Sequence, residues 1–353
     1  MRVLLAVIVA LAGCLPSSRQ RQHTEALTPG DSLSRQLAAT IPIDSLTLAW
    51  VADAQPALGL PTTLLWLPGS LAGGLGGALV VADTRASTLH RFTADGRHAG
   101  VVASLTDRSF PYLAGHRGDT LVVLSRGTDH LEFLVGGQAV RSAPLLEGTT
   151  AALATDAAVY VKTTGDAPAL FRLGADRRQD ERWRLVGPAW RHRGFLRAWG
   201  DSLLSLSGYR PVVDVLAPGV SAGAVLDTLA LVGFDSPQLM HSHQFMLGEE
   251  EEPPLMTPAA VAVGDRLFVL NLRVDVVRVD VYGRDGRIER ALVGPWPEEG
   301  LRGFPVDLAV RQEGNDYALA VLFQNPGGAF SRPGGRLTLY RWQPAPDALT
   351  AAP

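Results

Sequence analysis

The stretch "TPAAVAVGDRLFVLNLRVDVVRVDVYGRDGRIERALVG", residues 257–294, decides the fold class. Its apolar residues alternate with others in short runs, which are separated by Gly264-Asp265, a polar loop and Asp285-Gly286. Alternation with a period of two is typical of β-strands, and two-residue turns of this kind favour tight hairpins. We therefore expect residues 257–294 to form a meander of antiparallel strands.

The same pattern recurs along the chain in six degenerate copies. From residue 44 onward, helical periodicity is scarce, and short alternating segments are separated by Gly, Pro, Asp and Asn. The repeating unit averages roughly 47 residues, which falls in the range of four-stranded propeller blades. The copies span residues 62–105, 111–146, 150–187, 194–233, 257–294 and 304–344.

The sixth copy contains only three apparent strands, and its missing strand has a candidate at the other end of the chain. Residues 45–52, "SLTLAWVA", form an alternating apolar run that belongs to no copy. Because a propeller must close its ring, such a strand would complete the last blade and tie the chain ends together. We therefore predict an all-β, six-bladed β-propeller with four-stranded antiparallel blades, the last blade being closed by an N-terminal strand.

The repeated pattern P-x-x-hydrophobic-A-hydrophobic, then G-D-x-L-x-V, then D-G-R resembles six-bladed propellers of the NHL type, including propeller lipoproteins of bacterial envelopes. The resemblance covers residues 44–343. It implies the architecture but not the activity, because this fold hosts lyases, lactonases, receptors and scaffolds. The third and fourth copies fit least well, which leaves a seventh or irregular blade open. Even spacing disfavours a further alternative, a pair of β-sandwiches.

The first residues have the organisation of an export signal. Met1-Arg2 precedes a ten-residue apolar segment, and Ala12-Gly13 precedes Cys14, the only cysteine. "LAGC" resembles the lipobox of bacterial lipoproteins, which implies a signal peptide over residues 1–13 and lipidation of Cys14. The alternative is an ordinary secretory signal followed by an incidental cysteine.

The expected organisation is a tether, a propeller and a short tail. Residues 14–43 would carry the lipid and hold the propeller, residues 44–343, away from the membrane, and residues 344–353 would form the tail. We expect an envelope location, in the outer membrane facing the periplasm or the cell surface. The net charge of -3 disfavours nucleic acid. The expected partners of this monomer are the membrane and an envelope protein, peptide or anionic glycan.

A ring of basic residues is the first candidate site. The loops that join the second and third strands of propeller blades open on the same face as the links between blades. Each of these loops carries a basic residue close to the end of the second strand, and convergent cations there would attract an anionic ligand. Basic residues are 32 of 353, however, so short loops often hold one by chance. The six residues are Arg85, Arg126, Lys162 (the only lysine), Arg210, Arg273 and Arg332.

The expected inner strands offer little chemistry. Their polar and aromatic residues are chiefly His116, Arg197, Trp199 and Asp307. Lactonase-like propellers hold a divalent metal in the channel with oxygen ligands from several blades, and Asp307 stands almost alone here. No Ser-His-Asp or G-x-S-x-G pattern is present either. We therefore predict no catalytic residue.

An insertion at residues 235–257 separates the fourth and fifth copies. On a strand, its His241 and His243 would share one face and could bind zinc or copper, with a glutamate completing the site. A divalent metal at this pair is the one cofactor that the sequence suggests. The glutamates at 249–252 could instead fold over the basic funnel and compete with an anionic partner. The alternative for the whole segment is a solvated loop, which charge runs usually form.

Two functional classes follow from these features. The leading one is a membrane-anchored binding or scaffold module of the cell envelope, because no catalytic motif rises above background. The alternative is a metal-dependent enzyme or metal binder that uses the channel or the pair His241 and His243.

Overall fold

The computed structural model describes most of the chain from residue 36 onward. The described residues are 36–52, 57–68, 77–165, 167–174, 179–217, 225–273, 275–297, 303–325, 327 and 334–344. The predicted export signal and Cys14 lie outside these ranges, as does Arg332. Within them, no helix has the length and apolar character needed to cross a membrane.

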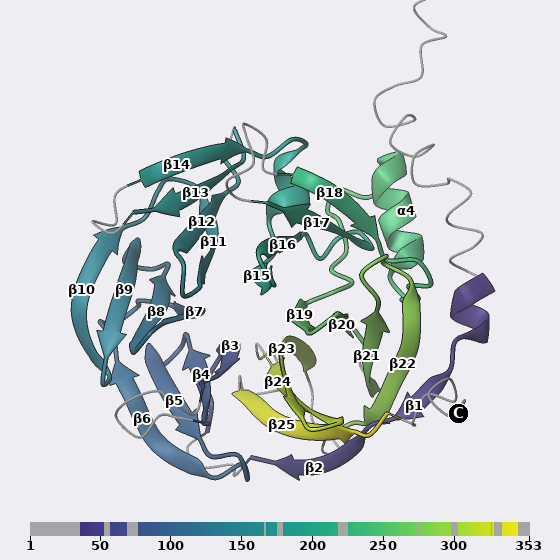
Figure 1. The fold of residues 1–353 in the computed structure, drawn as a ribbon, viewed down its shortest axis with the longest axis horizontal. Helices are drawn as coiled ribbons and strands as arrows, with labels where there is room; N and C mark the ends of the chain where they lie inside the picture. Colours follow the sequence, from purple (N-terminus) through teal and green to yellow (C-terminus); the bar gives the residue numbers. More distant parts are fainter. Residues whose placement is uncertain are drawn as a thin grey trace, which may run out of the picture.

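Antiparallel strands are arranged as blades around a central axis (Figure 1). Blade 1 contains β3 (Pro61–Trp66), β4 (Leu79–Asp83), β5 (Thr88–Phe92) and β6 (His98–Ser104). Blade 2 contains β7 (Pro111–Arg117), β8 (Thr120–Ser125), β9 (His130–Val135) and β10 (Gln138–Pro144). Blade 3 contains β11 (Thr149–Ala154), β12 (Val159–Thr163), β13 (Ala169–Leu173) and β14 (Gln179–Arg184). In each blade the first strand lies nearest the axis.

The second half of the ring repeats this arrangement. Blade 4 contains β15 (Leu196–Trp199), β16 (Ser202–Leu206), β17 (Val212–Leu216) and β18 (Val225–Ala230). Blade 5 contains β19 (Ala259–Val263), β20 (Arg266–Asn271), β21 (Val276–Tyr282) and β22 (Ile288–Pro295). Blade 6 contains β23 (Phe304–Glu313), β24 (Asp316–Asn325) and β25 (Gly334–Trp342). The described strands thus form six blades rather than seven, and they do not form two sandwiches.

An N-terminal strand closes the ring, which confirms the sequence prediction. Strand β2 (Thr47–Val51) pairs antiparallel with β25 and is the outermost strand of blade 6 (Figure 1). Just before it, β1 (Ile43–Ser45) pairs parallel with β22 as a fifth strand of blade 5, which we did not predict. The Nε1 of Trp342, on β25, donates a hydrogen bond of 3.0 Å to the carboxylate of Asp44, on β1. The N-terminal segment therefore binds two adjacent blades.

Blades 2 and 3 make a close backbone contact at their inner strands. Gly115 of β7 pairs with Ala154 of β11 in a single parallel bridge, which joins the two blades into one sheet. Gly115 has φ +125°, and a Cβ there would lie 2.6 Å from the Ala154 carbonyl oxygen. Only glycine fits this position without strain.

Apolar side chains fill the spaces between the blades. An aromatic group joins blades 5 and 6, where Tyr317 stacks on Trp342 with ring centroids 5.2 Å apart and Phe268 lies 5.2 Å from Tyr317. Fully burying one such side chain contributes about 1.5–3 kcal/mol. Packing between blades thus holds the ring, as the alternating sequence pattern predicts.

Two short helical elements lie in the links that flank blade 4. The 3₁₀ helix η1 (Ala189–His192) connects blades 3 and 4. Helix α4 (Leu239–Leu247) lies in the insertion between blades 4 and 5, outside the ring of strands (Figure 1). The two elements contact each other, because Trp190 of η1 and Phe245 of α4 pack edge to face with centroids 5.8 Å apart.

Candidate functional site

A cavity of about 280 Å³ lies where the inner strands begin, and we call it the axial cavity. Five blades contribute side chains to it, because the starts of inner strands and the ends of second strands meet at this face. Its principal walls are Thr62, Tyr112, Phe195, Tyr209, Leu255 and Val306. The loops in which we expected the ring of basic residues open on this same face.

Glycines shape the blade 4 side of the axial cavity. A Cβ on Gly194 would lie 1.8 Å from the carbonyl oxygen of Leu206. Gly208 has φ +80°, and a Cβ there would lie 2.7 Å from Leu255 of the insertion. The Met256 amide also donates a 2.7 Å hydrogen bond to the Gly208 carbonyl. The end of the insertion is therefore fixed against blade 4 and becomes a wall of the cavity.

One arginine lines the axial cavity, and a second packs on one of its walls. The guanidinium of Arg126 lies 4.1 Å from the ring centroid of Tyr112 and donates a hydrogen bond to the Thr150 carbonyl. Arg193 lines the cavity directly and is exposed to solvent. The cavity thus combines aromatic and aliphatic walls with positive charge at its opening.

A buried ion pair crosses the axis below Phe195. Arg197 packs on the Phe195 ring at 4.7 Å and donates a 3.0 Å hydrogen bond to Asp307. Backbone amides of Leu64 and Leu308 also donate to Asp307, at 2.9 and 3.0 Å. Burial raises the pKa of the Asp307 carboxyl, whereas Arg197 and the two amides oppose that rise. Both oxygens of Asp307 are engaged, so this carboxylate ties blades 6, 4 and 1 together.

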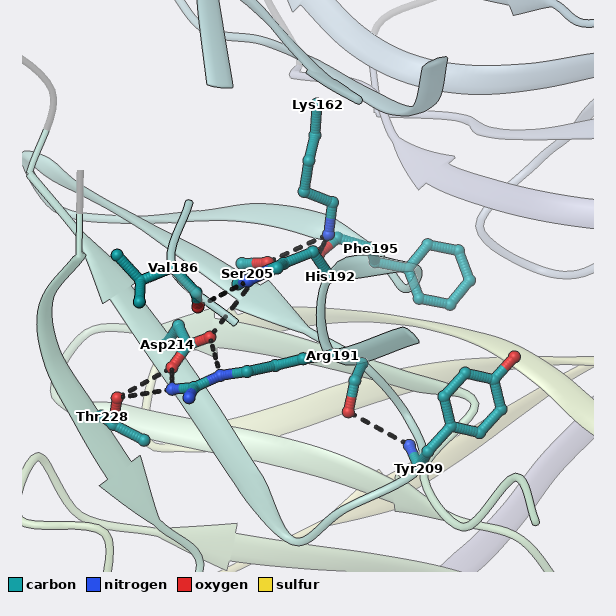
Figure 2. Close-up of polar contacts among 10 residues, drawn as sticks. Lys162, Val186, Arg191, His192, Phe195, Ser205, Tyr209, Asp214 and Thr228 are labelled. Carbon is teal, nitrogen blue, oxygen red and sulfur yellow. Dashed lines mark hydrogen bonds and ion pairs between the residues drawn. The ribbon is translucent and has the colours of Figure 1, made fainter. Parts of the chain in front are cut away.

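Behind the Phe195 wall lies the only lysine, fully buried between blades 3 and 4 (Figure 2). The Nζ of Lys162, on β12, donates to the Phe195 carbonyl at 3.2 Å and contacts the Ser205 hydroxyl at 3.0 Å. Burial lowers the pKa of Lys162 to about 7; Asp214 opposes this shift and Arg197 adds to it. Lys162 is therefore not part of an exposed basic ring, although it lies next to the cavity wall.

Asp214 organises the remainder of this cluster from β17 (Figure 2). Its carboxylate accepts two hydrogen bonds from Arg191, of 3.0 and 2.5 Å, and one of 2.8 Å from Thr228. The Nδ1 of His192 lies 3.8 Å away, while Nε2 lies 3.0 Å from the Val186 carbonyl. Burial lowers the pKa of His192. These contacts hold η1 against blade 4 and so position the Arg193 to Phe195 segment.

The other basic positions that the sequence singled out are dispersed. Arg126 packs on Tyr112, a wall of the axial cavity, and Arg85 is exposed at the blade 1 loop. Arg210 is partly buried, and Arg332 lies outside the described residues. Arg193 was not predicted, because the candidate positions came from loops within blades and Arg193 lies in a link between blades. The sequence "RHRGF" just before an expected inner strand was the available signal.

Arg273 anchors the start of the insertion. It donates a 2.9 Å hydrogen bond to the Asp235 carboxylate, which Arg278 also contacts at 2.8 Å. The Asn271 side chain donates to the Asp235 carbonyl at 2.6 Å. The charge of Arg273 is therefore engaged within the protein in this structure.

The two histidines of the insertion lie on a helix, not on the strand that a shared metal-binding face requires. His241 and His243 both belong to α4, where residues two positions apart point to different sides. His241 instead contacts Glu250 at 2.7 Å. Among the described residues, no group of three or more His, Cys, Asp or Glu could hold a metal ion. The insertion lines the axial cavity through Leu255 and Thr257 rather than through its glutamates.

No protein-family model and no curated protein matches the chain. Among solved structures, it is similar to regucalcin, a calcium-binding protein from Agrobacterium tumefaciens, at 12% identity and TM-score 0.51 over 86% of this chain and 97% of that one. A Bacteroides fragilis protein whose name calls it exported matches at 10% identity and TM-score 0.50, over 87% and 100%. Streptogramin B lyase matches at 12% identity and TM-score 0.48, over 83% and 97%. At such identities the likeness concerns the fold alone, and it places the chain among the β-propellers.

Proposed function

We propose that the chain is a lipid-anchored envelope protein whose propeller binds an anionic ligand with a flat apolar part in the axial cavity. The observation that carries this proposal is the cavity itself, which five blades build around aromatic walls and an arginine-bearing rim. Sites of this kind, concave and largely apolar with a few placed polar groups, are where proteins bind small ligands.

The walls and the rim select different parts of such a ligand. Tyr112, Phe195 and Tyr209 offer ring faces on which an aromatic or sugar ring can stack. Arg193 and Arg126 offer guanidinium groups, which pair well with carboxylate, sulfate or phosphate oxygens. The volume of about 280 Å³ suits one small molecule, or one residue of a longer peptide or glycan.

Two hydroxyl groups of the cavity lining make hydrogen bonds to the backbone. Thr62 donates a 3.1 Å hydrogen bond to the Pro111 carbonyl, and the Ser207 hydroxyl accepts one of 3.3 Å from the Tyr209 amide. Neither is paired with a base among the described residues. This arrangement favours binding over nucleophilic catalysis as the function of the site.

The export signal supplies the location in this proposal. "LAGC" at residues 11–14 would place a lipid on Cys14, and residues 14–43 would tether the propeller to the membrane. The cavity would then face the aqueous side of the envelope, where a protein, peptide or anionic glycan can reach it.

Calorimetric titration with naphthalene-2-sulfonate, a flat anion, tests the proposal. The full-length protein in lipid nanodiscs should bind one equivalent, with empty nanodiscs as the blank. Phe195→Ala and Arg193→Met should each weaken binding by about tenfold or more, because they remove a stacking wall and a charge-assisted hydrogen bond. Arg97→Met is the matched control, since Arg97 is exposed at a blade 1 hairpin. Equal affinity in all four proteins, or no binding, contradicts the proposed function.

A further inference from the structure

Lys162 is an exception in this chain, which uses arginine for every other basic position except histidine. Of the 32 lysine and arginine residues, one is a lysine, and it is fully buried. Arginine stays charged in proteins, whereas a buried lysine can release its proton. At this buried position the lysine can therefore become neutral, whereas an arginine would stay charged.

The hydrogen bonds around Lys162 match a neutral amine better than an ammonium group. An ammonium has three N–H donors, but among the described residues only the Phe195 carbonyl and the Ser205 hydroxyl lie within bonding distance of Nζ. A neutral amine can donate to Phe195 and accept from Ser205. The charged form is therefore incompletely satisfied, in agreement with a pKa lowered to about 7 by burial.

The charged groups that act on this amine oppose each other. Asp214 of β17 attracts the ammonium, but Asp214 is already engaged by Arg191 and Thr228. Arg197 of β15 repels it, and the neutral His192 of η1 lies in the same cluster. A further negative charge nearby would therefore shift the proton equilibrium.

The axial cavity is where such a charge can enter. The Phe195 backbone, whose carbonyl accepts from Lys162, forms the partition between the amine and the cavity. An anion in the cavity stabilises the ammonium on the other side of this wall. By thermodynamic reciprocity, the ammonium strengthens anion binding by the same factor.

We propose that Lys162 is a buried specificity determinant of the axial cavity, which takes up a proton from solvent as an anionic ligand binds and releases it as the ligand leaves. The site then prefers anions over neutral molecules of the same shape, and this preference grows as the pH falls. This inference rests on the proposed ligand-binding function.

Calorimetry with two probes measures the coupling. Naphthalene-2-sulfonate stays ionised, so every proton exchanged belongs to the protein or buffer. We expect its affinity to rise about threefold to tenfold from about pH 8.5 to about pH 6.5, as a unit charge across one wall of a half-solvated site implies. Repeating the titration in two buffers of different ionisation enthalpy should show net proton uptake at about pH 7.5. The neutral analogue naphthalene-2-methanol should show neither effect.

Variants assign the proton to its residue. Lys162→Met should abolish both the pH dependence and the proton uptake, whereas Arg97→Met should retain them. Unchanged uptake in Lys162→Met overturns the inference while leaving the binding function intact. Absence of sulfonate binding at every pH contradicts the binding function itself.

A measurement on the unmodified protein covers the case in which Lys162→Met does not fold. Because Lys162 is the only lysine, lysine labelled with carbon-13 at Cε gives one NMR signal from the protein. Its titration midpoint should lie near pH 7 and move upward when naphthalene-2-sulfonate saturates the site. A midpoint that does not move in the ligand-saturated protein contradicts the proposal.

Discussion

At Lys162, burial and charge oppose each other within one side chain. Folding removes the amine from water, and the two hydrogen bonds of Nζ replace only part of the lost solvation free energy. Attraction by the Asp214 carboxylate replaces another part of that free energy. A methionine of similar length would fill the same space without this conflict, so Lys162 lowers the stability of the fold at neutral pH.

We predict that Lys162→Met flattens the pH dependence of stability above neutral pH. Burial lowers the pKa of Lys162 from 10.5 to about 7, so between these values the unfolded chain holds a proton that the folded protein lacks. The destabilisation is complete below the folded pKa and disappears as the pH rises toward the unfolded one. Between about pH 7 and about pH 9.5, wild-type stability should rise by up to ~3 kcal/mol more than that of the variant.

Urea unfolding of both proteins at the two pH values provides the measurement. Arg97→Met, which removes an exposed charge, should keep the wild-type slope. A Lys162→Met protein with the wild-type slope would show that the amine is charged in the folded state throughout this range.

Individual site residues were only partly predictable from the sequence. Asp307 was recognised as an inner-strand carboxylate, but its partner Arg197 lies 110 positions away, and no local pattern joins the two. Lys162 was assigned to an exposed loop because it closes an expected strand, whereas the packing of blade 4 buries it. Contacts between blades decide both cases, and a repeat pattern describes only contacts within a blade.

At the scale of elements, the junction of β7 and β11 depends on a single glycine. Gly115→Ala should destabilise the protein by about 2–4 kcal/mol, because its Cβ would meet the Ala154 carbonyl at 2.6 Å and φ is +125°. Gly100→Ala separates the two causes, since Gly100 has φ +109° but nothing within 4 Å of an added Cβ. Thermal unfolding should show a much smaller loss for Gly100→Ala. Equal losses would mean that backbone strain alone is responsible.

Helix α4 shows where pattern reading of elements fails. The alternation of His241 and His243 suggested a strand, but Gly248 follows the segment with φ +81° and caps a helix. A glycine just after an apolar-rich run is a helix-termination signal. Strand β1 was missed for another reason, because it is three residues long and its Ile43 is 70% exposed. Too few residues alternate there to form a pattern.

For the whole molecule, the repeat was sufficient to predict the architecture. The two-residue periodicity and the regular turns predicted six blades, and the orphan run at residues 45–52 predicted the closing strand. The axial cavity was not predictable in detail, since its walls come from five blades and from the end of an irregular insertion.

The proposed membrane anchoring concerns the whole molecule, and one substitution tests it. Cys14→Ala should abolish incorporation of an alkyne-tagged palmitate in a bacterial host and release the protein from the membrane fraction, because one anchored thioether and its acyl chains would be lost. Ser18→Ala is the matched control in the tether. Label that persists in Cys14→Ala, or that is missing from the wild-type protein, contradicts the lipoprotein assignment.

Closure of the ring by β2 also determines the order in which the strands can pair during folding. Thr47 pairs with Arg341, so one of the first strands to be synthesised must wait for the last one. Pairings this distant in sequence form slowly. Until the C-terminal strand arrives, β2 and the edge of blade 6 are both open, and either can pair with the same element of another copy. Dilution during refolding should therefore favour the closed monomer, and crowding of nascent chains should favour strand-exchanged oligomers.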